Sequence, residues 1–176
     1  MKNYYGSYVR CPLGMLYAIS SGKGIIYLAF TDKIDVQAVK DKYSSECNAL
    51  IKNESNDLLN FLEKELELYF KGKLKVFNTP IELKGTDFQK EVWSSLIQIP
   101  YGQTWSYEQQ ARFMEQPLAI RAIASSNGKN PISILIPCHR VIGKNGSLTG
   151  YAGGLDRKKA LLKHELEFRS PVNTLF

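Results

Sequence analysis

The residues most able to do chemistry in this chain are Cys138 and His139, which directly follow an apolar stretch. That stretch, Ile132-Ser133-Ile134-Leu135-Ile136, ends at Pro137, and a residue before proline is driven to extended backbone. The spacing predicts that Cys138 lies at the mouth of a pocket beside an imidazole. A nearby histidine lowers the pKa of a thiol, so the pair could form a nucleophile and its base. Taken alone, the pair is more typical of a core cysteine followed by a surface histidine.

The second half of the chain, which carries this pair, is predicted to be mainly helical. Thr86-Asp87-Phe88-Gln89 and Ser106-Tyr107-Glu108-Gln109 are two capping boxes, and each predicts the start of a helix. The second of these helices should end near Glu115, and Pro117 should begin another that ends at Gly128. Two short helices joined by a tight turn indicate a helix-turn-helix, although helical proteins that bind nothing share the pattern.

The helix expected over residues 117–128 has an unusual face of small residues. They recur at spacings of three and four beside Arg121, and they are Ala119, Ala122, Ser125 and Ser126. Small side chains let a helix approach another surface closely, and an arginine can insert where a base has left a stack. Tight packing within a core and an ordinary solvated arginine would produce the same pattern.

The first half of the chain predicts an α/β domain without a chemical signature. Residues 4–9, 14–19 and 24–30 have the composition of short strands in an antiparallel meander. Helices are expected from about residue 33 to 43 and from about residue 55 to 70. We therefore expect an α/β protein: a support domain with an antiparallel sheet at residues 1–80, a linker around 78–85, and a mainly helical domain at residues 86–170. Cys11 and Cys47 receive no role.

Composition and charge narrow the class of function. The formal net charge of +6 indicates an anionic partner, with nucleic acid first, although a lysine-rich surface would give the same value. Three widely spaced cysteines and two histidines form neither a disulfide framework nor a zinc cluster, which favours a reducing compartment and a metal-free function. No apolar stretch is long enough to span a bilayer, and the N-terminus is unlike a signal peptide.

From about residue 86 to 165 the chain resembles the O6-alkylguanine-DNA alkyltransferases, also called methylated-DNA–protein-cysteine methyltransferases. The resemblance is carried by Gln89, Val92-Trp93, Ile99-Pro100-Tyr101-Gly102, Thr104, Ser106-Tyr107, Arg121-Ala122, Asn127-Gly128, Asn130-Pro131, Pro137-Cys138-His139-Arg140-Val141-Ile142-Gly143, Tyr151-Ala152-Gly153-Gly154 and His164-Glu165. Before residue 86 the resemblance is only architectural, and it implies a ribonuclease H-like fold for the N-terminal domain. Because so many matches occur in order, we interpret Cys138 and His139 as a nucleophile and its base, not as a core cysteine and a surface histidine.

The resemblance implies a DNA repair enzyme that flips O6-alkylguanine, and as a further candidate O4-alkylthymine, out of double-stranded DNA. The alkyl group would pass irreversibly to Cys138, so each molecule would act once and inactivate itself. The implied protein is a monomer that needs no metal or other cofactor and does not bind membranes. Its implied location is the cytoplasm, or the nucleus if the source is eukaryotic.

The resemblance also assigns roles to residues around the cysteine. His139 and Glu165 would activate the Cys138 thiol, with a water between thiol and imidazole, as in other sets of nucleophile, base and orienting residue. Asn130 would hold the loop behind the cysteine. Tyr151 would donate a hydrogen bond to the guanine O6, assisted by the backbone amide of Ala152.

The remaining assignments concern DNA. Tyr107 would help to turn the nucleotide, and Arg121 would fill the gap that the nucleotide leaves. The implied DNA contacts are Tyr107, Arg121, Ala122, Ser125 and Arg140, and the implied pocket is lined by Tyr107, Val141, Tyr151 and Ala152.

The chain departs from the family at several positions in and near the groove helix. Relatives often have glycine at Ala124 and alanine at Ser126, and Met114-Glu115 replaces an Ile-Gly, so the groove helix is bulkier here.

A non-catalytic, alkyltransferase-like lesion-binding protein would recruit other repair factors, but such proteins usually have tryptophan at the cysteine position. A cysteine hydrolase would turn over repeatedly, and a helix-turn-helix regulator would leave the thiol idle.

Overall fold

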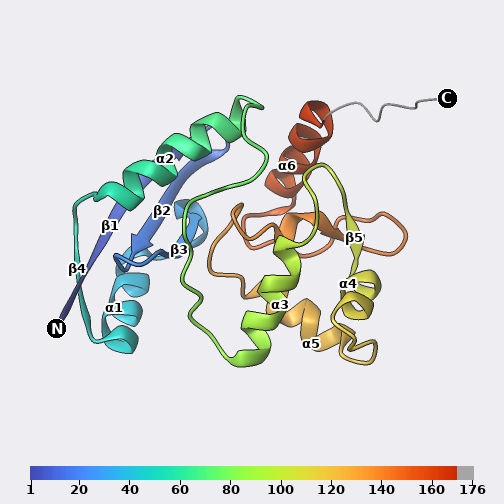
Figure 1. The fold of residues 1–176 in the computed structure, drawn as a ribbon, viewed down its shortest axis with the longest axis horizontal. Helices are drawn as coiled ribbons and strands as arrows, with labels where there is room; N and C mark the ends of the chain where they lie inside the picture. Colours follow the sequence, from blue (N-terminus) through green and yellow to red (C-terminus); the bar gives the residue numbers. More distant parts are fainter. Residues whose placement is uncertain (170–176) are drawn as a thin grey trace.

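The computed structural model describes residues 1–169, so the expected end of the second domain at residue 170 lies outside the described residues. Figure 1 shows a sheet-containing N-terminal half beside a mainly helical C-terminal half. The sheet consists of β1 (Lys2–Cys11), β2 (Gly14–Ser20), β3 (Ile25–Phe30) and β4 (Ala49–Lys52). The helices are α1 (Val36–Cys47), α2 (Asp57–Phe70), α3 (Asp87–Ile97), α4 (Tyr107–Phe113), α5 (Ile120–Gly128) and α6 (Leu155–Phe168). The predicted α/β class is confirmed.

The N-terminal sheet is mixed, with strand order β3-β2-β1-β4. The predicted antiparallel meander of β1, β2 and β3 is confirmed. The sequence reading missed β4, which pairs with β1 in parallel and makes the sheet mixed. Strand β3 runs parallel to β1, because both strands are antiparallel to β2. The chain then crosses over through α1 and enters β4 in the same direction as β3, so β4 is parallel to β1.

Each face of the sheet is covered by a different layer. On one face α1 closes a small cluster that includes Tyr17, Ile26 and Tyr43. On the other face α2 packs over a larger core that continues without interruption into α3 of the C-terminal half. The two halves therefore share one hydrophobic core, and residues of the sheet domain can reach the C-terminal site.

Local signals set where the helices begin. Thr86 and Ser106 form the two predicted capping boxes, at the start of α3 and α4. Two expected starts are corrected. In the first, α1 begins at Val36 rather than about residue 33, because Thr31–Lys33 form a 3-10 turn and the Asp35 side chain accepts from the Ala38 amide, which makes Asp35 the N-cap.

The second correction concerns the helix-turn-helix. Helix α5 begins at Ile120 rather than at Pro117, because a further turn precedes it in which the Ala119 amide donates to the Gln116 carbonyl at 3.0 Å. Helix α4 ends at Phe113, and Glu115 then adopts a left-handed φ of 58°. The helix pair itself is confirmed, and within residues 1–169 no helix is long and apolar enough to cross a bilayer.

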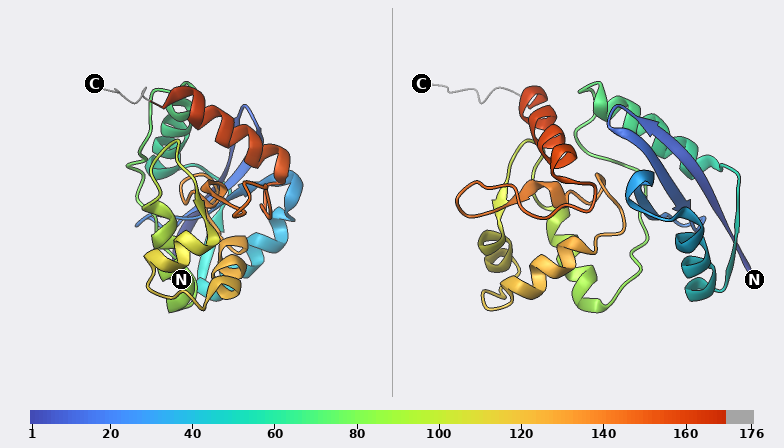
Figure 2. Two further views of the ribbon diagram at one scale, coloured as in Figure 1. Left: turned by 90° about the vertical axis from the view of Figure 1, so that its right-hand side faces the viewer. Right: turned by 180° about the vertical axis from the view of Figure 1, so that it is seen from behind.

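The C-terminal ends of α2 and α6 lie against each other (Figure 2). The rings of Tyr69 and His164 have their centroids 5.1 Å apart, and His164 Nε2 lies 2.7 Å from the Tyr69 carbonyl oxygen. This contact brings the end of an N-terminal helix to the helix that carries Glu165.

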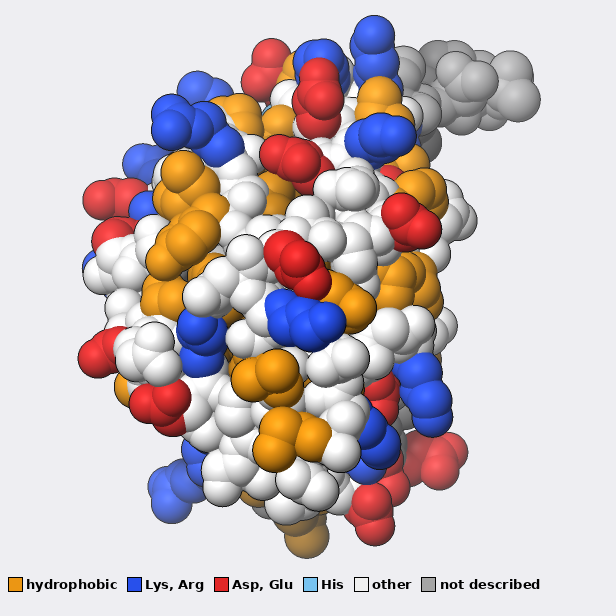
Figure 3. All heavy atoms as spheres, turned by 90° about the vertical axis from the view of Figure 1, so that its left-hand side faces the viewer, with side chains coloured by type: hydrophobic (Ala, Val, Ile, Leu, Met, Phe, Trp, Pro, Cys, Tyr) orange, Lys and Arg blue, Asp and Glu red, His pale blue; other side chains and the backbone are white. Residues whose placement is uncertain are grey.

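The net positive charge does not gather on the outer face of the N-terminal half. Figure 3 shows basic and acidic side chains interspersed there, with apolar side chains between them. A surface of mixed sign has no strong attraction for a polyanion. The expected contact with nucleic acid therefore has no support from this face.

Candidate active site

Cys138 begins a short 3-10 turn, Cys138–Arg140, at the end of a buried loop. Asn130 holds this loop from behind, because its Nδ2 donates to the Ile136 carbonyl at 2.8 Å and to Cys138 Sγ at 3.2 Å. Its Oδ1 accepts from the Ile132 amide at 2.9 Å. One amide side chain thus fixes both ends of the loop and the sulfur atom, which is the arrangement that the family resemblance implies for Asn130.

The apolar stretch before Cys138 is a strained loop supported by β3. The Leu28 amide donates to the Pro131 carbonyl at 2.9 Å, and the Ser133 amide donates to the Leu28 carbonyl at 2.8 Å. Ile134 has a φ of 73°, which is rare for a β-branched residue and persists only where the surroundings enforce it. The N-terminal sheet therefore helps to hold the nucleophile loop.

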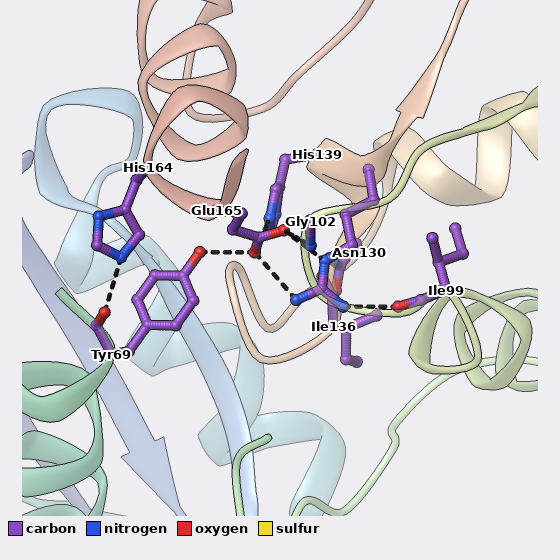
Figure 4. A network of polar contacts seen from close by, with 9 residues as sticks. Tyr69, Ile99, Gly102, Asn130, Ile136, His139, His164 and Glu165 are labelled. Atoms are coloured by element: carbon purple, nitrogen blue, oxygen red, sulfur yellow. Dashed lines mark hydrogen bonds and ion pairs between the residues drawn. The ribbon is translucent and has the colours of Figure 1, made fainter. Parts of the chain in front are cut away.

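Behind the cysteine, Glu165 is the centre of a buried polar network (Figure 4). Its Oε1 lies 2.7 Å from the Tyr69 hydroxyl, 2.8 Å from His139 Nε2 and 2.9 Å from Arg140 Nη2. Its Oε2 accepts from Arg140 Nε at 2.9 Å and from the Gly102 amide at 3.2 Å. The structure thus joins the imidazole and the carboxylate, the pair that the sequence reading assigned to thiol activation.

Arg140, which the resemblance placed among the DNA contacts, is buried against Glu165. Its guanidinium forms a two-pronged ion pair with Glu165 and donates from Nη1 to the Ile99 carbonyl at 2.7 Å. The side chain is only 7% exposed, and the guanidinium lies over the ring of Tyr101. All three guanidinium nitrogens donate inside the protein, so Arg140 stabilises the carboxylate, and its contact with DNA stays a prediction.

The charge states of the network follow from burial and from these contacts. Burial acts to raise the pKa of the Glu165 carboxyl, but His139 and Arg140 outweigh it and hold the pKa well below its usual range. Burial lowers the pKa of His139, against the opposing effect of Glu165. At neutral pH the network is therefore a carboxylate with a neutral imidazole, whose Nε2–H donates to Glu165. Its buried Nδ1 has no hydrogen-bond partner among residues 1–169 and is free to accept a proton.

Cys138 itself is a protonated thiol in the resting protein. Burial raises the pKa of its thiol, while the hydrogen bond from Asn130 and the charge of Lys158 act in the opposite direction. No direct hydrogen bond joins Sγ to the imidazole in the described part of the chain. A water between the two side chains therefore stays a prediction.

Sequence reasoning missed two buried residues that contact the site, Tyr69 and Lys158. Tyr69 belongs to α2, a helix to which we assigned no chemistry, and its helical spacing marked it only as a core residue. Lys158 is fully buried, and its Nζ donates to the carbonyls of Val141 at 2.6 Å and Thr149 at 2.8 Å. One signal pointed to Lys158, because it lies on the same helical stripe as Leu161 and Glu165.

The other predicted residues surround the cysteine turn. The Tyr151 hydroxyl is buried without a hydrogen-bond partner among residues 1–169, and burial raises its pKa well above its usual value. The Tyr107 hydroxyl donates to the Thr149 carbonyl at 3.3 Å, which joins α4 to the loop before Tyr151. Of the predicted pocket residues, Val141 is buried and Ala152 is exposed.

The predicted small face of the groove helix is only partly correct. Arg121, Ala122 and Ser125 are exposed on α5, as a contact with DNA requires. Ser126 is buried, and its carbonyl accepts from the Trp93 indole at 2.8 Å. Because it holds α5 against α3, Ser126 does not belong to the exposed face.

Replacing Tyr69 with phenylalanine is expected to lower stability by about 1 kcal/mol and to slow alkylation of Cys138. The change removes one hydrogen bond to Glu165 and leaves the ring packing in place, so the carboxylate loses part of what orients it. Chemical denaturation and single-turnover alkylation would measure both effects, with Tyr8→Phe at an exposed tyrosine as the control. Unchanged stability and rate would contradict the assignment.

A buried cysteine whose sulfur accepts from Asn130, beside a buried His–Glu–Arg network and a helix-turn-helix, is the arrangement expected of a protein that combines thiol chemistry with a nucleic-acid-binding motif. The family model of the 6-O-methylguanine DNA methyltransferase DNA-binding domain matches residues 87–167, and the model of its ribonuclease-like domain matches residues 3–83. This chain belongs to the 6-O-methylguanine DNA methyltransferase family.

Individual relatives agree with the family models. The methylated-DNA–protein-cysteine methyltransferase of Methanosarcina mazei is 42% identical over 164 residues, covering 92% of this chain and 96% of that protein. The inducible enzyme of that name from Bacillus subtilis is 41% identical over 157 residues, covering 89% and 87%. The crystal structure of Mycobacterium tuberculosis OGT in complex with DNA has a TM-score of 0.80 at 35% identity, covering 95% of this chain and 96% of that one.

Proposed function

We propose that this protein repairs O6-alkylguanine in double-stranded DNA by transferring the alkyl group to Cys138, once per molecule. The observation that carries the proposal is a thiol positioned by Asn130 and followed in the chain by an imidazole that a buried carboxylate holds. Asn130 binds the sulfur and its loop, and His139 is held by the ionised Glu165. A non-catalytic lesion-binding protein would not need a positioned thiol with a neutral base next to it.

The transfer is a single displacement. The Cys138 sulfur attacks the alkyl carbon, the S–C bond forms, the C–O6 bond breaks, and its electron pair passes to the guanine. His139 Nδ1 takes up the thiol proton, through a water, and Glu165 stabilises the imidazolium that forms. The Tyr151 hydroxyl and the Ala152 amide donate hydrogen bonds to O6 and stabilise the negative charge that develops there. The guanine anion then takes a proton from water, and the imidazolium of His139 returns its proton to water. The sum of these steps is a thiol and an O6-alkylguanine converted to a thioether and guanine.

The product explains why each molecule would act only once. An alkyl thioether has no leaving group that a base at this site could expel, so the thiol is not regenerated. The O6 carbon of a paired guanine lies inside the duplex, and the base must leave the stack at a cost of a few kcal/mol. Helix α5, with exposed Arg121, would enter the minor groove and fill the gap.

Compartment and oligomeric state are part of the same proposal. The thiol must stay reduced and the substrate is DNA, so we place the protein in the cytoplasm, or in the nucleus if the source is eukaryotic. All the contacts to Cys138 and Glu165 described above come from one chain, so a monomer suffices.

The decisive measurement is the intact mass of the protein after mixing with duplex DNA that contains one O6-methylguanine. We expect a stoichiometric gain of one methyl group on Cys138, and no gain with Cys138→Ala or with undamaged DNA. Tight lesion binding without a change of mass would identify a lesion-binding protein instead. Repeated release of alcohol or acid from an ester would identify a hydrolase.

Replacing Arg121 with alanine is expected to slow transfer from duplex DNA by about 10- to 100-fold, because the flipped state loses the side chain that fills its gap. Transfer from single-stranded DNA should change little, since no stack has to be opened. The control is Lys129→Ala, which removes one exposed positive charge at the end of the same helix. An equal slowing on both forms of DNA would contradict the role in flipping.

A further inference from the structure

Arg157, in the first turn of α6, reaches into the N-terminal half of the protein. Its Nε donates to the Leu13 carbonyl at 2.9 Å, and its Nη1 donates to the two carboxylate oxygens of Asp32 at 2.8 and 3.1 Å. The guanidinium carbon lies 4.0 Å from the centre of the Phe30 ring. The hydrogen bond from Arg157 lowers the pKa of Asp32, so this carboxylate stays ionised.

The socket for this guanidinium is built from backbone as well as side chains. Gly14 has a φ of 133°, and a Cβ at this position would lie only 2.9 Å from Arg157 Nη2. Any larger residue would therefore displace the guanidinium. The turn between β1 and β2 thus leaves a space that the arginine occupies.

The same guanidinium holds the segment that carries Tyr151. Its Nη1 also donates to the Gly153 carbonyl at 3.1 Å. A Cβ on Gly153 would lie 2.6 Å from the Tyr151 ring and 3.0 Å from Phe30, so the tyrosine ring, this backbone and the β3 side chain are in close contact. Arg157 therefore joins the Tyr151 segment to the end of β3.

This segment needs such support from outside. Three of its residues from 150 to 154 are glycines, and Gly150 and Gly154 adopt left-handed φ values of 52° and 92°. Glycine allows many backbone conformations, so the segment depends on its contacts. Besides Arg157, these include the Gly154 amide, which donates to the Tyr151 carbonyl at 2.9 Å, and Lys158 Nζ, which donates to the Gly150 carbonyl at 3.4 Å. The Tyr151 hydroxyl makes no hydrogen bond of good geometry among residues 1–169, and Ser133 is the side chain that interacts with it.

We propose that Arg157 is a positioning residue for alkyl transfer, through which the N-terminal half fixes Tyr151 at the place where the leaving guanine O6 arrives. The inference rests on the proposed function. Small displacements of a catalytic group have large kinetic effects, and a misplacement of 1 Å can cost about 100-fold in rate. Arg157 contacts neither thiol nor DNA in this role, so its loss should alter the rate of transfer and leave lesion affinity unchanged.

The test is a double-mutant cycle of Arg157→Met and Tyr151→Phe, read out as the single-turnover transfer rate at saturating DNA. We expect Arg157→Met to slow transfer by about 10-fold when Tyr151 is present and to have little further effect in the Tyr151→Phe protein. Lesion affinity, measured in a Cys138→Ala background, should stay within about 2-fold. Lys159→Met, an exposed neighbour on α6, is the matched control and should behave as the wild type.

The inference would be overturned if the effects of Arg157→Met and Tyr151→Phe on the transfer rate were additive. It would also be overturned if Arg157→Met lowered lesion affinity and left the transfer rate unchanged. If Arg157→Met does not fold, Asp32→Asn removes only the partner carboxylate. Like Arg157→Met, Asp32→Asn should slow transfer only when Tyr151 is present. An unchanged transfer rate in Asp32→Asn would count against the role of Arg157. A wild-type protein that gains no alkyl group would refute the proposed function itself, whatever the outcome for Arg157.

Discussion

Replacing Glu165 with glutamine is expected to slow alkyl transfer by about 100-fold or more and to destabilise the fold by about 3 kcal/mol. Glutamine has nearly the same shape but carries no charge, so Arg140 is left buried opposite a neutral group. His139 loses the anion that would stabilise its protonated form. The rate falls because the base is weakened, and the stability falls because a buried charge has lost its partner.

Denaturant unfolding at several pH values separates the two effects of Glu165. The pKa of this carboxyl is depressed in the folded protein, so its contribution to stability is complete above the unfolded pKa, near 4.3. The contribution is lost as the pH falls below that value toward the folded pKa. The wild type should therefore lose stability in acid more steeply than Glu165→Gln.

The matched control for this experiment is Glu167→Gln, at an exposed position two residues further along α6. It should leave both rate and stability unchanged. If Glu165→Gln kept the wild-type rate, the His139–Glu165 pair would be a structural feature without a part in thiol activation.

Replacing Lys158 with methionine is expected to lower stability by about 2 kcal/mol and to loosen the loop over residues 141–150. Methionine keeps the apolar stem but removes the ammonium group that binds the carbonyls of Val141 and Thr149. Those carbonyls then lack the donor that holds them together. The change also removes a positive charge that favours the thiolate of Cys138.

Hydrogen–deuterium exchange over residues 141–150, together with denaturant unfolding, would measure the effect of Lys158→Met. Exchange there should increase relative to the wild type, while exchange in the β1–β3 meander should not. Lys159→Met alters the exposed neighbour and serves as the control. Equal protection of the loop in both variants would show that Lys158 does not hold it.

The residues around Cys138 show which parts of the site can be predicted from the sequence and which cannot. Residue types and adjacency singled out Cys138 and His139, and the family resemblance favoured their catalytic reading and added Asn130. Glu165 was found through the family resemblance and its place on the apolar side of a helix. The strained φ of Ile134 was not predictable, because the support for it comes from Leu28 in a distant strand.

Arg140 has contacts that the sequence did not reveal. The family resemblance placed it among the DNA contacts, and that assignment stays a prediction. In the fold it is buried against Glu165, which lies 25 residues away in the sequence. Nothing in the local pattern distinguishes an arginine that pairs with a buried carboxylate from one that faces solvent.

The sequence by itself determined the features that depend on neighbouring residues. These are the two capping boxes, the β1–β3 meander and the helix-turn-helix, whereas the chemistry of the cysteine motif was predicted only with the family resemblance. Tertiary structure alone decided the features that join distant residues: Tyr69 meets Glu165 across 96 positions, and Arg157 meets Asp32 across 125. A cap or a hairpin forms from groups a few residues apart, whereas the partner of a buried charge is set by whichever segments surround it once the core has closed.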